Sequence, residues 1–169
     1  RPLQHQSRDG RSHGRRRGWR LLRRELLRLE ATRHVQRRPD TQMDENTPED
    51  VPELVLKGIE EFNKGEFYEC HEYLEEAWMQ EPRRVRFLYQ GILQVGVGFY
   101  HQQNGNWRGA TGLLRNGTAR LKEFEPVTLG IDVARLVQEC ERCIEELEEL
   151  GSERVGEFDQ TKVPNVEWA

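Results

Sequence analysis

The spacing of apolar residues between Pro48 and Leu150 constrains this chain most strongly, because it is helical throughout. Apolar side chains recur at steps of three and four, and no run alternates between apolar and polar residues as a half-buried strand would. Four breaks divide the region, at Asn63-Lys64-Gly65, at Pro82, at Asn104-Gly105-Asn106 and between Pro126 and Gly130. Because glycine, proline and asparagine interrupt helices, the sequence predicts an all-α fold, a compact bundle of about five helices.

Local signals place several helix ends. Thr47 is a good N-cap and precedes Pro48, so the first helix is expected to start there. The third helix, about residues 84–103, is apolar on several faces and is therefore expected at the centre of the bundle. Asp132 is positioned to cap the fifth helix.

A shift of 40 residues aligns the first two helices of the region with the next two. The aligned pairs include Gly65 with Gly105, Phe67 with Trp107, and Leu74 with Leu114. Each unit is a helix, a glycine turn and a second helix that opens with an aromatic residue, which is similar to a tetratricopeptide hairpin. Two units are fewer than the three that an open solenoid needs. We therefore expect a closed bundle of helical hairpins, two of them related by a 40-residue internal repeat, with the fifth helix covering the open side.

The formal net charge of −4 averages two different segments. Residues 1–42 hold 13 Arg, no Lys and four acidic residues, a net charge of +9. Residues 43–169 hold 13 basic and 26 acidic residues, a net charge of −13. Blocks of one charge sign are typical of disordered segments. We predict a basic, disordered leader over 1–42 that is separate from the working protein, a helical domain over 43–150 and a polar C-terminal tail over 151–169.

Composition also bounds the partners and the compartment. The acidic body is expected to repel nucleic acid, whereas the basic leader could contact a polyanion. No stretch approaches the roughly 18 apolar residues of a membrane-spanning helix, so no membrane partner is expected. Three cysteines are too few for a disulfide scaffold and favour a cytoplasmic protein, with Cys140 and Cys143 as small core residues. A homo-oligomer is compatible with the sequence, which does not determine it.

One face of the predicted second helix carries polar residues that need partners. His71, Glu75 and Trp78 share that face at steps of four and three. The face adjoins the apolar stripe of the same helix, so His71 and Glu75 are expected to be half buried and to require polar partners or a metal. The third helix supplies further polar groups, including His101. The residues expected to line this site are Glu72, Trp78, Tyr89, Gln90 and Gln94.

Three interpretations of this site are open. His71, Glu75 and His101 form a ligand set that suits a divalent metal, zinc or iron. The same groups also suit a metal-free network that fixes helix packing. A third interpretation makes Glu75 the group that orients a catalytic His71. A zinc-protease motif is excluded, because Glu75 stands where that motif needs its second histidine. The sequence assigns no reaction, so it does not decide whether the protein is an enzyme.

Several stretches resemble the domain of unknown function 309 family. They are FNKGEFYECHE over residues 62–72, the His71-x-x-x-Glu75-x-x-Trp78 motif, YQGILQ over 89–94 and GNWRGA over 105–110. The similarity covers about residues 54–124. It implies a prokaryotic, all-helical protein without an established activity, whose His-x-x-x-Glu-x-x-Trp motif has been suggested to bind metal. Cys70 departs from the alanine that the family more often has.

The function expected from the sequence follows from that resemblance. It is an uncharacterised helical bundle with a divalent-metal site at His71, Glu75 and His101. The alternative is a tetratricopeptide-like protein-interaction module, in which the His71–Glu75 pair is a structural network.

Overall fold

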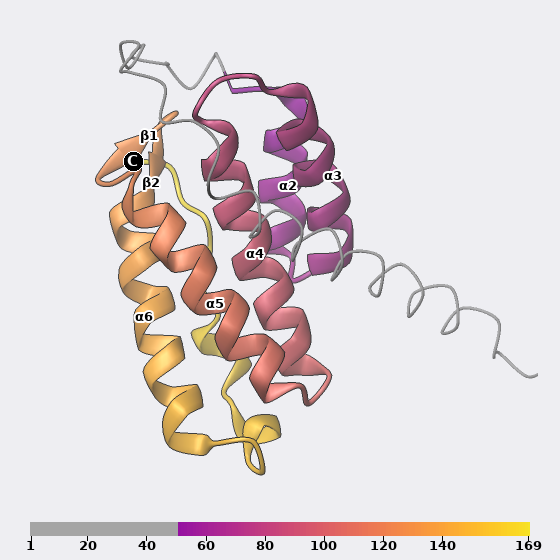
Figure 1. Ribbon diagram of the computed structural model, residues 1–169, viewed down its shortest axis with the longest axis vertical. Coiled ribbons are helices and arrows are strands. Elements are labelled where there is room, and N and C mark those ends of the chain that lie inside the picture. Colours follow the sequence, from indigo (N-terminus) through magenta and orange to yellow (C-terminus); the bar gives the residue numbers. More distant parts are fainter. Residues whose placement is uncertain (1–50) are drawn as a thin grey trace, which may run out of the picture. The chain divides into compact units, whose positions relative to one another are not determined.

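The computed structural model describes residues 51–169 (Figure 1), and the predicted leader over 1–42 lies outside this range. Consecutive helices of the described part pack against one another as antiparallel hairpins, in the order α2 to α6. The predicted all-α bundle of about five helices is confirmed. The helices are α2 (Glu53–Asn63), α3 (Phe67–Gln80), α4 (Arg86–Gln103), α5 (Trp107–Lys122) and α6 (Val133–Leu150).

The helix ends follow local chemistry. α2 begins at Glu53, later than the predicted start beside Thr47, because Pro52 takes the N-cap position and its carbonyl accepts from the amide of Val55 (2.9 Å). Thr47 itself lies outside the described residues. Gly65 and Gly105, with φ of 77° and 74°, follow α2 and α4 in the left-handed conformation that glycine adopts most easily. The carboxylate of Asp132 accepts from the amide of Arg135 (3.0 Å) and caps α6 as predicted.

Glycines bring the two helices of each hairpin close together. A Cβ atom on Gly58 of α2 would lie 2.6 Å from Cγ of Leu74 in α3. A Cβ atom on Gly98 of α4 would lie 2.8 Å from Cγ of Leu114 in α5. The two hairpins therefore share a glycine-against-leucine contact at positions 40 residues apart, while the internal repeat as such stays a prediction.

A small β-hairpin between α5 and α6 was absent from the sequence prediction. β1 (Val127–Thr128) and β2 (Ile131–Asp132) are antiparallel, with Val127 opposite Asp132 and Thr128 opposite Ile131. Each strand has two residues, which is too short for an alternating pattern to be recognised.

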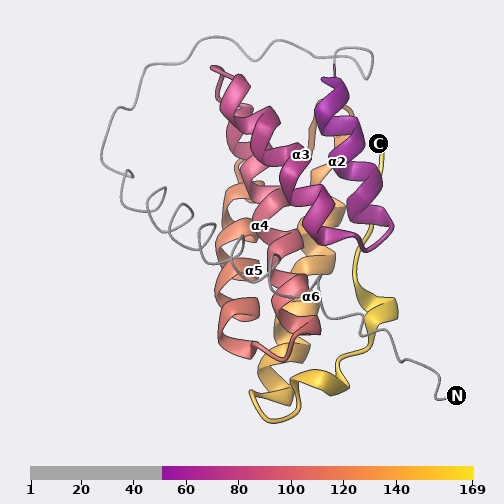
Figure 2. The ribbon, with the colours of Figure 1, turned by 90° about the vertical axis from the view of Figure 1, so that its right-hand side faces the viewer.

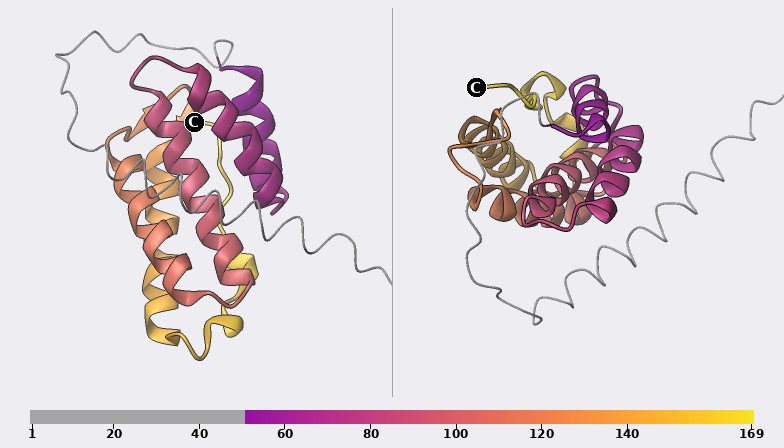
Figure 3. Two further views of the ribbon diagram at one scale, coloured as in Figure 1. Left: turned by 45° about the vertical axis from the view of Figure 1, so that its right-hand side comes forward. Right: turned by 90° about the horizontal axis from the view of Figure 1, so that it is seen from above.

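The C-terminal residues pack on the bundle rather than forming only a polar tail. They contain the 3₁₀-helices η2 (Val155–Glu157) and η3 (Gln160–Lys162) and run back along the bundle to the β-hairpin (Figure 2). Phe158 and Val166 are buried, whereas Trp168 is 45% exposed. Seen from above, the helices follow an arc from α2 to α6, and this segment lies in the gap (Figure 3). The open side is thus closed by the C-terminal segment together with α6, and not by the fifth helix alone.

Candidate functional site

His71 and Glu75 form a hydrogen-bonded pair on α3. Nε2 of His71 donates to Oε2 of Glu75 at 2.9 Å, and the exposed fractions of the two side chains are 5% and 32%. The hydrogen bond from His71 lowers the pKa of the Glu75 carboxyl, against the opposing effect of burial. The sequence predicted this pairing from the four-residue spacing, and each residue supplies a polar partner for the other.

Aromatic and guanidinium groups link Trp78, three residues after Glu75 on α3, to α4 and α5. Cζ of Arg86 lies 4.5 Å from the ring centroid of Trp78 and 5.7 Å from that of Phe87. Cζ of Arg120, on α5, lies 5.8 Å from the Phe87 centroid. Nε of Arg120 also donates to Oε1 of Gln94 at 3.1 Å. A continuous set of contacts therefore joins α3, α4 and α5.

We call this surface the polar strip. Its residues are His71, Glu75 and Trp78 of α3, Arg86, Gln90 and Gln94 of α4, and Arg120 of α5. Gln90 stands one helical turn from both Arg86 and Gln94, so it extends the same face. Gln90 and Gln94 are buried, with exposed fractions of 3% and 1%, whereas Glu75, Trp78, Arg86 and Arg120 are partly exposed.

Four buried N–H groups of the polar strip make no hydrogen bond within residues 51–169. They are Nε1 of Trp78, Nε of Arg86, and Nε2 of Gln90 and of Gln94. The amide of Gln94 is oriented by Arg120, which can only donate, so the nitrogen of Gln94 is the group left over. A buried donor without an acceptor costs about 1–3 kcal/mol. The polar strip therefore has unused donors, while its one carboxylate, Glu75, already accepts from His71.

Glu72 and Tyr89, which are also predicted to line the site, interact with residues outside the polar strip. Glu72 is exposed and interacts with Tyr68, whose pKa is raised by burial and then by this carboxylate. Tyr89 is fully buried, and its hydroxyl makes no hydrogen bond within the described residues. Burial, followed by the nearby charge of Glu81, raises the pKa of Tyr89 to about 12. Glu72 and Tyr89 as site-lining residues therefore stay predictions.

The structure does not bring His101 together with His71 and Glu75. Nδ1 of His101 lies 3.3 Å from Nδ2 of Asn106, at the turn between α4 and α5. His101 shares a helical face with Gln94, and that face is the one that meets α5 through Arg120. Within residues 51–169, no group of three or more His, Cys, Asp or Glu side chains is arranged to hold a metal ion.

The described residues fit a divalent cation poorly. A structural zinc site uses four protein ligands and a catalytic one uses three, whereas His71 and Glu75 supply two. The polar strip also holds the guanidinium groups of Arg86 and Arg120, and these two positive charges disfavour a metal ion. The donor set of this surface suits an oxygen-rich anion better.

Arg86 and Arg120 are the residues of the polar strip that sequence reasoning missed, together with Phe87, whose ring both guanidinium groups contact. The cluster of arginines at positions 83, 84 and 86 is a signal for Arg86 that the sequence does contain. Arg120 had no local signal, because only the packing of α5 on α4 brings it to Gln94.

The cysteines of the described part are free and buried, as predicted for core residues. Burial raises the pKa of Cys143 to about 12, so its thiol stays protonated at neutral pH. No helix within residues 51–169 combines the length and the apolar character needed to cross a membrane.

Comparisons with known proteins support the family predicted from the motifs. The model of a family described as "Domain of unknown function (DUF309)" matches residues 55–113. The chain is 32% identical over 105 residues to "Uncharacterized protein YpuF" of Bacillus subtilis (strain 168), and the alignment covers 60% of each protein. The chain thus spans about 60% of the length of this relative. No solved structure gave a significant match. The family match includes every residue of the polar strip except Arg120.

Proposed function

We propose that this chain, which carries the DUF309 domain in residues 55–113, is an anion-binding helical bundle. Its polar strip binds a ligand that presents carboxylate or phosphate oxygens. The observation that carries the proposal is the set of four buried N–H donors without acceptors, beside the guanidinium groups of Arg86 and Arg120. Ligand oxygens would satisfy these donors and remove the cost of leaving them buried.

The electrostatics of the polar strip support an anion in particular. Hydrogen bonds between N–H donors and an ionised oxygen are roughly twice as strong as neutral ones. Arg86 is held in place over the Trp78 ring, so its guanidinium is pre-ordered for an acceptor. Arg120 is likewise anchored by its hydrogen bond to Gln94. The site places two cations together on a body whose net charge is −13, which would make it a selective point for an anion.

Isothermal titration calorimetry at constant ionic strength tests the proposal. Citrate represents carboxylates and inorganic phosphate represents phosphates, so the two titrations separate the sources of the oxygens. We expect saturable binding of at least one probe, weakened at least tenfold by Arg120→Gln. The matched control is Arg115→Gln, which removes the same charge from an exposed position of α5 that pairs with Glu148 instead. Equal losses in the two variants, or no saturable binding of either probe, would contradict the proposal.

Divalent-metal binding by His71, Glu75 and His101 stays a prediction with less structural support, since only two of its ligands meet. Elemental analysis of the purified chain and of His71→Ala tests it. If the purified chain contained stoichiometric zinc or iron and His71→Ala did not, the ligand of this site would be a metal ion and not an anion. A tetratricopeptide-like interaction module, a cytoplasmic location and a homo-oligomer also stay predictions.

A further inference from the structure

The C-terminal segment, residues 155–169, is held on the bundle largely through its backbone. The side-chain amide of Asn63, at the end of α2, donates to the carbonyl of Val166 (3.0 Å) and accepts from the amide of Val166 (2.7 Å). Near the end of α4, Nε2 of Gln102 donates to the carbonyl of Val155 (3.1 Å). Two helices that belong to different hairpins therefore each bind main-chain atoms of the segment.

The last residues of the segment also add to the β-hairpin. The amide of Asp132 donates to the carbonyl of Glu167, and the amide of Ala169 donates to the carbonyl of Gly130, both at 2.8 Å. Residues 167–169 thus lie beside β2, and Trp168 forms an antiparallel β-bridge with Ile131. Addition of an extended chain to a sheet edge is a common mode of peptide recognition, because the main chain provides affinity for many sequences.

Three side chains of the segment make contacts that could provide selectivity. Val166 is 2% exposed, and Phe158 is buried with its ring centroid 6.4 Å from that of Phe99. The carboxylate of Glu167 accepts from Arg135 of α6 at 2.6 Å. The contacts therefore select for three side chains: an aromatic one, an aliphatic one and, directly after the aliphatic one, an acidic one.

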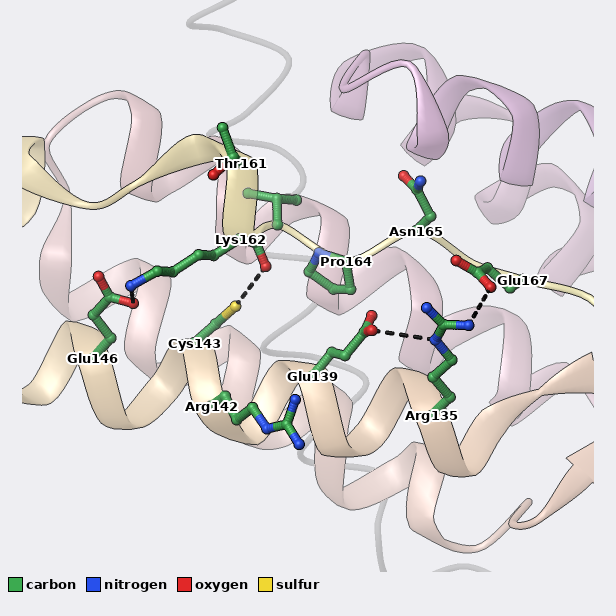
Figure 4. Close-up of a pocket in the computed structure, with 11 residues that line it drawn as sticks. Arg135, Glu139, Arg142, Cys143, Glu146, Thr161, Lys162, Pro164, Asn165 and Glu167 are labelled. Atoms are coloured by element: carbon green, nitrogen blue, oxygen red, sulfur yellow. Dashed lines mark hydrogen bonds and ion pairs between the residues drawn. The ribbon is translucent and has the colours of Figure 1, made fainter.

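The segment packs incompletely on α6. A cleft of about 470 Å³ lies between them, lined by residues of α6 and by residues 161–165 and Glu167 (Figure 4). Across it, Lys162 pairs with Glu146 and the thiol of Cys143 donates to the carbonyl of Lys162 (3.2 Å). The ion pairs there are exposed, and such pairs typically contribute about 0–1 kcal/mol each. The contacts to α6 therefore hold the segment weakly.

We infer that the groove bounded by α2, α4, α6 and β2 is a peptide-binding site, which residues 155–169 occupy as a tethered ligand. Its partner is an extended segment of another protein that carries an aliphatic residue followed by an acidic one, as Val166 and Glu167 do. Residues 151–154 join the segment to α6, and a short link of this kind gives a tethered ligand an effective concentration in about the millimolar range. A partner displaces the segment only if its own concentration divided by its Kd exceeds the effective concentration of the segment divided by the segment's Kd. The inference involves no residue of the polar strip.

Release of the tethered segment in the full chain tests the inference. Val166→Asp places a charge in the buried aliphatic position and is expected to free the groove. A fluorescent peptide with the sequence of residues 155–169 should then bind saturably, at least tenfold more tightly than it binds the wild-type chain. Adding Asn63→Ala should weaken peptide binding about tenfold, because two backbone hydrogen bonds are lost. Asn104→Ala is the matched control, since Asn104 follows the end of α4 and its side-chain amide donates to the carbonyl of Tyr100 within the same helix.

Each alternative outcome overturns the inference. A Val166→Asp chain that unfolds without cooperativity would show that the segment belongs to the core. A folded variant that binds no peptide at a concentration of about 1 mM would show that there is no separate groove. Dimerisation of the wild type through exchanged C-terminal segments would show that the partner is a second copy of this chain and not another protein. Native-state hydrogen exchange of the unmodified chain is an independent measurement. The Val166 amide should exchange through a local opening, and exchange only by global unfolding would again overturn the inference.

Discussion

The hairpins α2–α3 and α4–α5 share a glycine turn and a glycine-against-leucine contact, yet they differ on one face. In α5, the hydroxyl of Thr111 donates to the carbonyl of Trp107 (3.0 Å), and Arg115 pairs with Glu148 of α6. Forty residues earlier, α3 has His71 and Glu75 at the same places, bonded to each other. Positions that serve helix packing in the second hairpin hold an ionisable pair in the first. The two hairpins therefore differ in the polar contacts of this face.

The hairpins also differ in how closely their helices meet. At position 117 in α5 a glycine stands where α3 has Ala77. A Cβ atom on Gly117 would lie 2.9 Å from the carbonyl oxygen of Gly91 and 3.0 Å from the backbone nitrogen of Val95. Backbone atoms of α4 and α5 are in contact there, and this close approach also positions Arg120 beside Gln94.

The largest effect is expected from Gly117→Ala. The added methyl group meets backbone rather than a flexible side chain, so α4 and α5 must separate. We expect a loss of about 3 kcal/mol in the free energy of unfolding, at the upper end for overpacking. Urea denaturation measures it.

Gly112→Ala on the same helix is its control, because a Cβ atom at Gly112 meets nothing within 4 Å. The better helix propensity of alanine should stabilise this control by up to about 1 kcal/mol. If Gly117→Ala lowered the free energy of unfolding no more than Gly112→Ala does, the backbone contact between α4 and α5 at Gly117 would be contradicted.

A smaller effect distinguishes the polar faces of α3 and α5. His71→Ala removes a buried donor to a carboxylate and should lower the free energy of unfolding by about 2 kcal/mol. Thr111→Ala at the matching position should cost about 1 kcal/mol or less, since its hydroxyl bonds within its own helix. Urea titration of both variants tests the difference, and equal losses would show that the pair on α3 has no special energetic role.

Much of this molecule could be predicted from local patterns. Helix spacing, Asp132 as a cap and glycine turns at Gly65 and Gly105 depend on nearby residues, so they were visible in the sequence. The His71–Glu75 pair was visible for the same reason. The position of Arg120 and the docking of Val166 on Asn63 could not be predicted, because each depends on packing between segments distant in the chain. His101 was grouped with His71 by residue type, but its helical face meets α5.

The smallest expected effect is a change in the acid dependence of stability. The pKa of Glu75 is lowered in the folded chain from its ordinary value of 4.5, chiefly by the hydrogen bond from His71. The stability that this shift contributes is present above pH 4.5 and is lost as the pH falls through the lowered pKa. Between pH 7 and pH 3, the wild type should lose about 1 kcal/mol more than Glu75→Gln.

Glu81 provides an internal reference for this comparison. The side-chain hydrogen bond from Arg83 lowers its pKa in the same direction, and that contribution is common to both proteins. Denaturant midpoints across the pH range measure the difference. Parallel acid profiles for wild type and Glu75→Gln would contradict the assignment to Glu75.

The most direct test of the anion site follows the indole N–H of Trp78 by NMR during titration with citrate and phosphate at fixed ionic strength. Trp107 is a control within the same chain, since its indole already donates to the carbonyl of Leu147 (2.7 Å), and Trp78→Phe assigns the signal. The proposed site predicts a saturable shift of the Trp78 indole with that of Trp107 unchanged. An unmoved Trp78 signal, or equal shifts of both indoles, would contradict it.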